Sequence, residues 1–155
     1  LDDRDGLGAG RHYLANQAIT FARVRSDFEH LPFVDSSFDV VVFNGAFHYA
    51  SDPRAVLAEA RRVSAPGGAV IIIDSPIYSD ISSGMKMLAE RPVHGRAGFL
   101  TFDGLRLMAD ALRLALHIDT PRPSLPRRLK RRLTEFRLGR GIATMGRVTL
   151  IVIDN

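Results

Sequence analysis

The chain has 155 residues, of which 46% are hydrophobic and 25% charged, which is the size and composition of one globular domain. It has no cysteine, which excludes disulfides, thiolate metal sites and a cysteine nucleophile, and we expect a reducing, cytoplasmic location. The formal net charge is +4, and the longest apolar run, Ala69–Ile73, is far too short to cross a bilayer.

The first part of the chain predicts two β-strands separated by a loop. Residues 1–17 are polar and glycine-rich, with a short helical segment predicted at 11–16. Ile19–Arg25 alternates apolar and polar residues, which is typical of a half-buried strand. We expect a loop at Leu31–Ser37, because it combines a proline with a run of turn-forming residues. Phe38–Phe43 is a nearly continuous apolar run, which predicts a strand buried on both faces.

A helix and another strand are predicted next. Asp52 followed by Pro53 is a helix start, because a carboxylate caps the first N–H groups and proline suits the first helical position. Apolar residues then recur on one helical face at Val56, Ala60 and Val63. The sequence APGG at 65–68 ends this helix, and Ala69–Ile73 follows as a second doubly buried strand. Residues 38–74 therefore predict a parallel strand–helix–strand crossover.

The second half of the chain has weaker patterns. A helix is expected at Ile81–Arg91, although a glycine and two serines weaken it. A better helix begins at Thr101 or Asp103, and its apolar stripe is Leu105, Met108, Leu112 and Ala115. His117–Thr120 predicts a short strand, and Val148–Ile153 predicts a last, buried strand.

Positive charge is concentrated in one segment. Nine basic residues lie between Arg122 and Arg147, and only Glu135 opposes them. Within this segment, residues 126–140 have an apolar stripe at Leu129, Leu133 and Phe136. Such a helix could contact nucleic acid or an anionic membrane, or dock on the domain, and a solvated helix face is the plainer alternative.

Several short motifs occur in a fixed order between residues 19 and 75. They are SDFEHLPF at 26–33, DSSFDVVV at 35–42, NGAFHY at 44–49, DP at 52–53 and APGG at 65–68. Their order and spacing resemble the class I S-adenosylmethionine-dependent methyltransferases, in the branch that acts on varied small molecules. The resemblance implies an α/β, Rossmann-like, mostly parallel sheet with flanking helices and an antiparallel last strand. Residues 1–155 would then be a partial methyltransferase domain, with its motif-bearing core at 19–75 and its substrate-side and C-terminal part at 76–155.

The resemblance implies S-adenosyl-L-methionine as the cofactor, bound past the carboxyl ends of the strands. Its adenine would lie against Asp27, whose carboxylate accepts hydrogen bonds from the amino group. Phe28 would offer its backbone N–H and its ring to the purine. Both residues have structural alternatives, because Asp27 is a common turn or cap residue and Phe28 suits core packing.

The methionine part of the cofactor would be lined by the turn Asn44, Gly45, Ala46 and Phe47. The resemblance places the next two residues, His48 and Tyr49, on the substrate side, with His48 as a candidate general base for an oxygen or carbon nucleophile. Asn44 could instead cap a helix, and either aromatic side chain could simply satisfy local contacts. The segment Ile77–Phe99 is expected to form a lid over the substrate.

Three glycines near the start of the chain resemble a nucleotide-binding loop. Gly6, Gly8 and Gly10 have no buried strand before them, and too few residues separate them from Ser26. We therefore expect the true glycine loop, the first two strands and the ribose-binding acid upstream of Leu1. Residues 1–155 alone should bind the cofactor weakly and fold poorly, because the missing strands would leave edges and apolar faces exposed.

The activity implied for the intact parent protein is methyl transfer to an unidentified small-molecule acceptor. A non-catalytic or degenerate methyltransferase-like binding module is the first alternative. A nicotinamide oxidoreductase is the weaker one, because it rests on the glycines at 6–10 alone. The five histidines are dispersed and indicate no metal site. The oligomeric state is left open.

Overall fold

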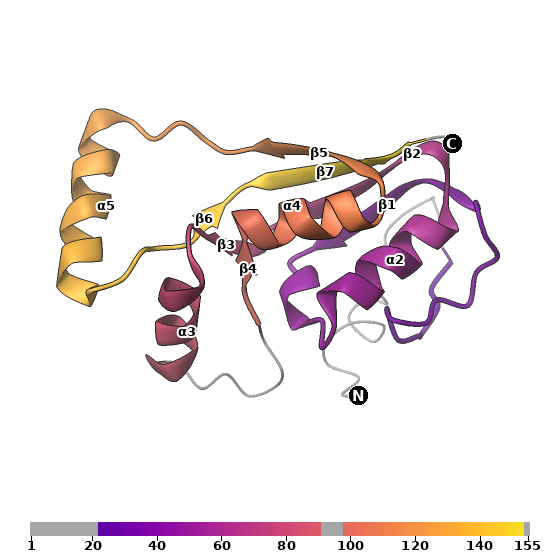
Figure 1. Cartoon of the computed structure of the whole chain (residues 1–155), viewed down its shortest axis with the longest axis horizontal. Coiled ribbons are helices and arrows are strands. Elements are labelled where there is room, and N and C mark those ends of the chain that lie inside the picture. Colours follow the sequence, from indigo (N-terminus) through magenta and orange to yellow (C-terminus); the bar gives the residue numbers. More distant parts are fainter. Residues whose placement is uncertain (1–21, 91–97, 154–155) are drawn as a thin grey trace, which may run out of the picture.

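The computed structural model describes residues 22–90 and 98–153, which form two β-sheets flanked by helices (Figure 1). The strands of the larger sheet are β1 (Phe38–Asn44), β2 (Ser64–Ile73), β5 (Leu114–Asp119) and β7 (Arg147–Val152). The smaller sheet contains β3 (Pro76–Tyr78), β4 (Leu100–Thr101) and β6 (Thr144–Met145). The helices are α2 (Pro53–Val63), α3 (Ile81–Glu90), α4 (Phe102–Ala111) and α5 (Leu125–Leu138), with a 3-10 turn η1 (Phe47–Tyr49).

The larger sheet has the strand order β1-β2-β7-β5. β1 and β2 are parallel and are connected through η1 and α2, which confirms the predicted crossover. β7 is antiparallel to both β2 and β5, so the last strand has the direction that the resemblance implied. The sheet is thus mixed, with one antiparallel strand inserted among strands that run the same way.

One face of this sheet carries the core. The register aligns Val70 of β2 with Val41 and Leu150, and Ile72 with Phe43 and Val148, so these side chains form one apolar layer. Helices α2 and α4 cover this layer, and Figure 1 shows both on the same side of the sheet. The predicted α2 stripe is confirmed, because the buried residues of this helix are Val56, Leu57, Ala60 and Val63. Complete burial of each larger aliphatic side chain contributes roughly 1.5–3 kcal/mol to folding.

The opposite face of the sheet is open over the described residues. Val40 and Val42 of β1 are 50% and 53% exposed, and Ile151 of β7 is also exposed. The prediction that β1 is buried on both faces is therefore wrong. In β2 one face is buried and the other is half-buried. Among the described residues, no helix lies against the second face of β1. The apolar run by itself does not reveal this.

The strand predicted at Ile19–Arg25 is also wrong where it can be compared. Residues 22–25 are exposed and belong to no strand, while residues 19–21 lie outside the described residues. A strand requires a neighbouring strand that pairs with its backbone hydrogen-bonding groups. Residues 22–25 have no such neighbour, because β1 pairs only with β2 in the described sheet. The helical segment predicted at 11–16 and the glycines at 6, 8 and 10 lie outside the described residues as well.

The C-terminal elements differ from prediction mainly at their boundaries. α4 begins after Thr101, whose Oγ1 accepts a hydrogen bond from the Gly104 N–H at 3.0 Å, which confirms one of the two predicted starts. It ends at Ala111, and Arg113, with φ of 53°, turns the chain into β5. The prediction that Ala115 continues this helix is therefore wrong, since β5 already begins at Leu114. Similarly, β2 begins at Ser64 and includes the APGG segment at 65–68, which was expected to be a turn ahead of the strand.

Candidate functional site

The carboxyl ends of β1 and β2 lie side by side, and each continues into a sharp turn. After β1, Gly45 has a left-handed φ of 60°, and its N–H donates to the Ile73 carbonyl at 3.0 Å. After β2, Asp74 has φ of 53°, which is uncommon for a residue with a side chain. The crevice beyond such strand ends is where open α/β sheets bind ligands. Gly45 leaves this point of β1 free of any side chain.

The predicted turn from Asn44 to Phe47 is present, but its members have different surroundings. Asn44 is exposed and the next two residues are half-buried. Asn44 does not cap the following turn, because Ala46 occupies the N-cap position of η1. Phe47 is fully buried and packs edge-to-face on Phe43, with ring centroids 5.1 Å apart. Its side chain belongs to the core, so Phe47 can line a ligand only through its backbone.

His48 connects η1 to the end of β2. Its Nδ1 lies 3.3 Å from the Oγ of Ser75, a residue that is almost completely buried. Burial of the imidazole lowers the pKa of His48 from its ordinary value of 6.5. The neutral ring therefore predominates at neutral pH, and one ring nitrogen can accept a proton. Tyr49 is exposed, and its ring lies 4.2 Å from the His48 ring, centroid to centroid.

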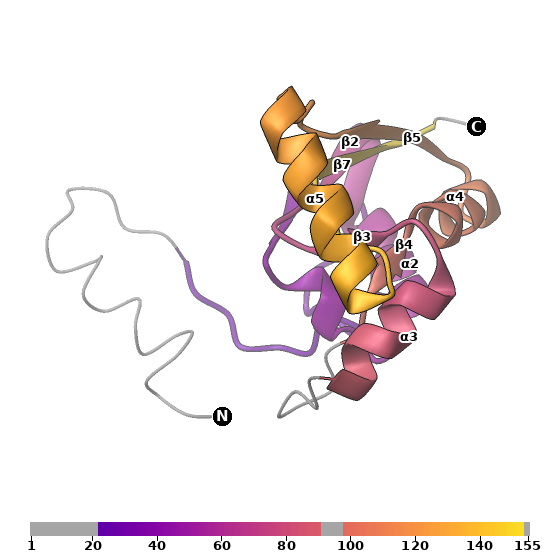
Figure 2. The same cartoon turned by 90° about the vertical axis from the view of Figure 1, so that its left-hand side faces the viewer.

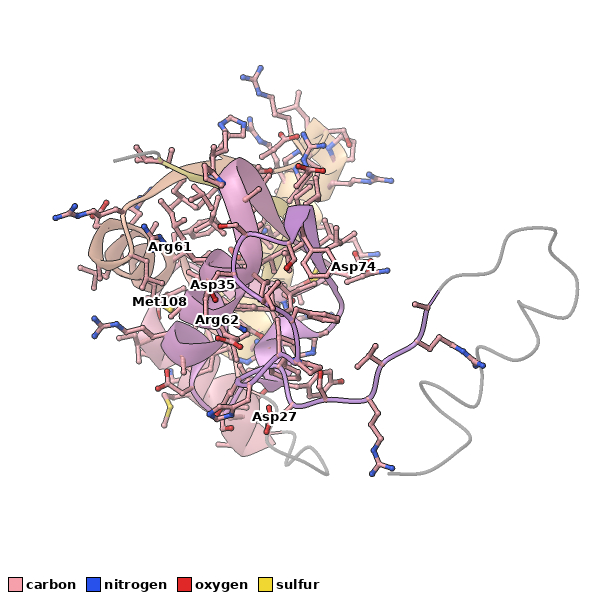
Figure 3. The ribbon with its side chains drawn as sticks, turned by 90° about the vertical axis from the view of Figure 1, so that its right-hand side faces the viewer. Asp27, Asp35, Arg61, Arg62, Asp74 and Met108 are labelled. Atoms are coloured by element: carbon pink, nitrogen blue, oxygen red, sulfur yellow. The ribbon has the colours of Figure 1, made fainter. Side chains whose placement is uncertain are left out.

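Asp27 lies in a tight, exposed turn. Its Oδ1 accepts a hydrogen bond from the Glu29 N–H at 3.0 Å, and its carbonyl accepts one from the His30 N–H at 3.1 Å. This is the turn role that the sequence left open as an alternative. Figure 3 shows the Asp27 side chain separated from Asp74, the residue of the turn after β2. The adenine contact of Asp27 stays a prediction.

Glu29 fixes the Asp27 turn to the segment that follows η1. Its Oε1 accepts hydrogen bonds from the Ser51 hydroxyl at 2.7 Å and from the Asp52 N–H at 3.1 Å. The turn therefore lies at the end of the sheet from which η1 and α2 depart. The neighbouring Phe28 packs against the core, as its structural alternative expected, and its backbone N–H role stays a prediction.

Arg62 of α2 holds the loop at residues 31–37, and sequence analysis did not single it out. Its guanidinium donates to both carboxylate oxygens of Glu59, at 2.7 and 2.8 Å. It also donates to three loop acceptors: the Asp35 carboxylate and the carbonyls of Leu31 and Phe33. Figure 3 shows Asp35 beside Arg62. The i, i+3 spacing of Glu59 and Arg62 is a signal for the pair, but no sequence pattern reveals the loop carbonyls.

The side of the site that the resemblance assigns to the substrate contains segments that are distant in sequence. The Gly98 N–H donates to the His48 carbonyl at 2.6 Å, which brings the start of β4 next to η1. A hollow beside this contact is lined by Pro53, Phe99, Leu100 and Met108, among others. The described part of the predicted lid at 77–99 forms β3 and α3, and residues 91–97 lie outside the described residues.

Comparison with known proteins adds a family match and three similar proteins. A family model described as a methyltransferase domain matches residues 7–72. The ubiquinone/menaquinone biosynthesis C-methyltransferase UbiE of Burkholderia cenocepacia (strain HI2424) is 28% identical over 117 residues, covering 74% of this chain and 48% of that protein. The crystal structure of YcgJ from Bacillus subtilis superposes with a TM-score of 0.62 at 17% identity, covering 96% of this chain and 77% of the other.

A geranyl diphosphate C-methyltransferase from Streptomyces coelicolor A3(2), solved with Mg²⁺, geranyl diphosphate and S-adenosyl-L-homocysteine, superposes with a TM-score of 0.61 at 14% identity. The superposition covers 83% of this chain and 52% of the geranyl diphosphate C-methyltransferase. Together with the α/β sheet, these matches support a class I S-adenosylmethionine-dependent methyltransferase. Residues 7–72 match the methyltransferase-domain model, and the fold is shared with solved methyltransferases.

The cofactor of the class I methyltransferases is S-adenosyl-L-methionine. The geometry at the end of β1 fits its methionine part, because Gly45 and Ala46 present only backbone and a methyl group there. The chain spans about half the length of the curated relatives that it matches. Among the described residues, no helix is both long and apolar enough to cross a membrane.

Proposed function

We propose that the protein transfers a methyl group from S-adenosyl-L-methionine to a small-molecule acceptor. The observation that supports this most directly is the convergence of the Gly45 turn, the Asp74 turn and the His48–Ser75 pair at the carboxyl ends of two parallel strands. The ligand crevice of open α/β sheets lies at such a point. A cytoplasmic location, suggested by the absence of cysteine, is part of the same proposal.

Each predicted site residue has a defined part in this proposal. The methionine part of the cofactor is held by the backbone of Asn44, Gly45, Ala46 and Phe47. The adenine is held by the second carboxylate oxygen of Asp27 and the backbone N–H of Phe28. Asp27 Oδ1 is already engaged by the Glu29 N–H, which fixes the orientation of the carboxylate. Tyr49, exposed beside His48, faces the acceptor.

His48 is the proton acceptor in the proposed reaction. When bound, the cofactor supplies an electrophilic methyl group on a sulfonium, so positioning of the acceptor contributes much of the rate. With its proton on Nδ1, donated to the Ser75 oxygen, the His48 ring leaves Nε2 free to take a proton from an oxygen or carbon acceptor. The lowered pKa of His48 keeps the ring in the required neutral form.

Binding can be tested without knowing the acceptor. We expect titration of the full chain with S-adenosyl-L-homocysteine to shift the NMR amide signals of residues 27–28 and 44–48. Asp27→Asn should weaken this binding by about tenfold, the loss of one hydrogen bond to a charged group. Asp103→Asn, on the exposed start of α4, should leave it unchanged. Shifts confined to other segments, or none at millimolar ligand, would contradict the proposed site.

A second experiment separates an enzyme from a binding module. The full chain is incubated with methyl-labelled cofactor and a protein-free extract of small molecules. Labelled product that disappears in His48→Ala supports methyl transfer with His48 as the base. Binding of S-adenosyl-L-homocysteine without any labelled product would favour the degenerate module instead.

A further inference from the structure

Helix α5 presents an apolar stripe that nothing in the described structure covers. Four residues at i, i+4, i+8 and i+11 lie on one helical face. They are Leu125 (78% exposed), Leu129 (63%), Leu133 (58%) and Phe136 (87%). No residue of α5 is buried. Docking of this stripe onto the domain, one of the alternatives left open by the sequence, is therefore absent from the described part of the chain.

The opposite side of α5 attaches the helix to the protein. Arg131 donates to Glu135 at 2.8 Å, to the Thr144 hydroxyl at 3.1 Å and to the Ile142 carbonyl at 2.6 Å. The Ile142 N–H in turn donates to the Glu135 carboxylate at 3.3 Å. These contacts turn the polar side of the helix toward β6, so the apolar stripe faces away from the domain.

The C-terminal end of α5 is held in the same way. The Lys86 ammonium of α3 donates to the Gly139 carbonyl at 2.9 Å, and Arg140 donates to Glu90 at 2.8 Å. Figure 1 shows α5 at one end of the molecule, remote from α2 and α4, and Figure 2 shows it lying across the front of that end. The helix is thus a fixed, outward-facing element and not a loose tail.

Basic side chains border the apolar stripe on both sides. On a helical projection, Arg128 and Arg132 lie along one border of the stripe, and Lys130 and Arg137 lie beyond the other. Within the described residues, no hydrogen bond or ion pair engages these four side-chain charges, whereas Arg131 is neutralised by Glu135. A hollow along the helix is lined by Leu125, Leu129, Arg128 and Arg132, and it extends to Pro123 and to the Arg131–Glu135 pair. Apolar and cationic groups therefore meet the same partner.

We propose that α5 docks in the plane of an anionic membrane surface. The apolar stripe enters the boundary between headgroups and acyl chains, and the flanking arginines and lysine extend to lipid phosphates. Nucleic acid would satisfy the positive charges but would leave Leu129, Leu133 and Phe136 in water. A bilayer with anionic lipid satisfies both sets of groups. This inference is independent of the methyl-transfer chemistry proposed above.

The chain contains no tryptophan, which provides a direct probe of this docking. Phe136→Trp in the full chain should give a blue shift of fluorescence with vesicles of phosphatidylcholine and phosphatidylglycerol, and none with phosphatidylcholine alone. Leu107→Trp, at an exposed position of α4, is the matched control and should give no shift with either. Arg128→Gln combined with Arg132→Gln should weaken vesicle partitioning by about tenfold or more. Adding Leu133→Ser to this double variant should weaken vesicle partitioning further.

Three outcomes would overturn the proposal. The first is an absence of any blue shift when anionic vesicles are added. This includes the case in which the Phe136→Trp emission is already blue-shifted without vesicles, because another part of the chain covers the stripe. The second is a blue shift of equal size with phosphatidylcholine alone. The third is binding that a single-stranded RNA competes away and that survives Leu133→Ser, which would identify a nucleic-acid surface.

Discussion

His48 and Ser75 form a side-chain pair that joins the end of β2 to the turn after β1. The Nδ1 of His48 lies 3.3 Å from the Ser75 Oγ, and Ser75 is almost fully shielded from water. The imidazole thus has a fixed orientation and a defined partner on one nitrogen. In the folded chain this pair is the most specific chemical feature at the carboxyl ends of the parallel strands, and its protonation can be measured directly.

We expect the imidazole of His48 to titrate below pH 6.5, because burial disfavours its charged form. The unfolded chain binds this proton more tightly, so the stability contribution is complete above pH 6.5 and is lost as the pH falls through the folded pKa. Carbon-13 and nitrogen-15 NMR of the labelled histidine measures both the pKa and the tautomer. We expect the proton on Nδ1, and Ser75→Ala should remove this preference. A His48 pKa at or above 6.5 would contradict this prediction.

Gly84 of α3 is required for packing even though glycine weakens a helix. A Cβ at this position would overlap the ring of Phe99, which itself packs edge-to-face on Tyr78 with centroids 5.8 Å apart. Intrinsic helix propensity predicts that Gly84→Ala stabilises by up to about 1 kcal/mol. We expect the opposite, a loss of about 1–3 kcal/mol from overpacking, measured by urea unfolding of the full chain. Met85→Ala, on the exposed side of α3, is the control and should change stability little. A stabilising Gly84→Ala would show that the ring moves aside freely.

Local patterns were sufficient to predict the central crossover. The Asp52–Pro53 helix start, the α2 stripe and the antiparallel β7 follow from residue types within a few positions of one another or from the family resemblance. The helix start and the α2 stripe depend only on the residue types within their own short segments. The resemblance also located the turn after β1, since its small residues are adjacent in sequence.

Features that depend on distant segments could not be predicted. The exposure of Val40 and Val42 depends on whether another element covers the second sheet face, which an apolar run does not encode. Phe47 lies in the motif of the site, yet its ring faces the core because the turn rotates it toward Phe43. The Ser75 partner of His48 lies 27 residues away and has no sequence signal of its own.

Asp52 is predicted to contribute about 1 kcal/mol through capping of α2. Its Oδ1 accepts hydrogen bonds from the Arg54 and Ala55 N–H groups, at 2.9 and 3.1 Å. Asp52→Ala leaves these donors at the helix start without their side-chain acceptor, and urea unfolding should show the loss. Asp103→Ala is the matched control, because that carboxylate makes only an exposed ion pair with Arg106, worth at most ~0.5 kcal/mol. Equal effects of the two substitutions would argue against a capping role.

Glu59 should make the stability of the chain sensitive to acid. The hydrogen bond from Arg62 is the main cause that lowers the pKa of Glu59 from 4.5 to about 2, assisted by the Leu31 N–H. The unfolded chain therefore binds the proton more tightly, so this stabilisation is complete above pH 4.5 and is lost as the pH falls toward 2.

Glu59→Gln tests this directly, because the amide keeps the size of the side chain and removes its charge. Urea unfolding should show lower stability than the wild type at pH 7 and a smaller decline between pH 4.5 and 2. Asp103→Asn should keep the wild-type pH dependence, since its ion pair is exposed. An identical acid decline in Glu59→Gln and the wild type would assign the acid sensitivity to other carboxylates. It would also show that the Glu59–Arg62 ion pair does not stabilise the loop at residues 31–37.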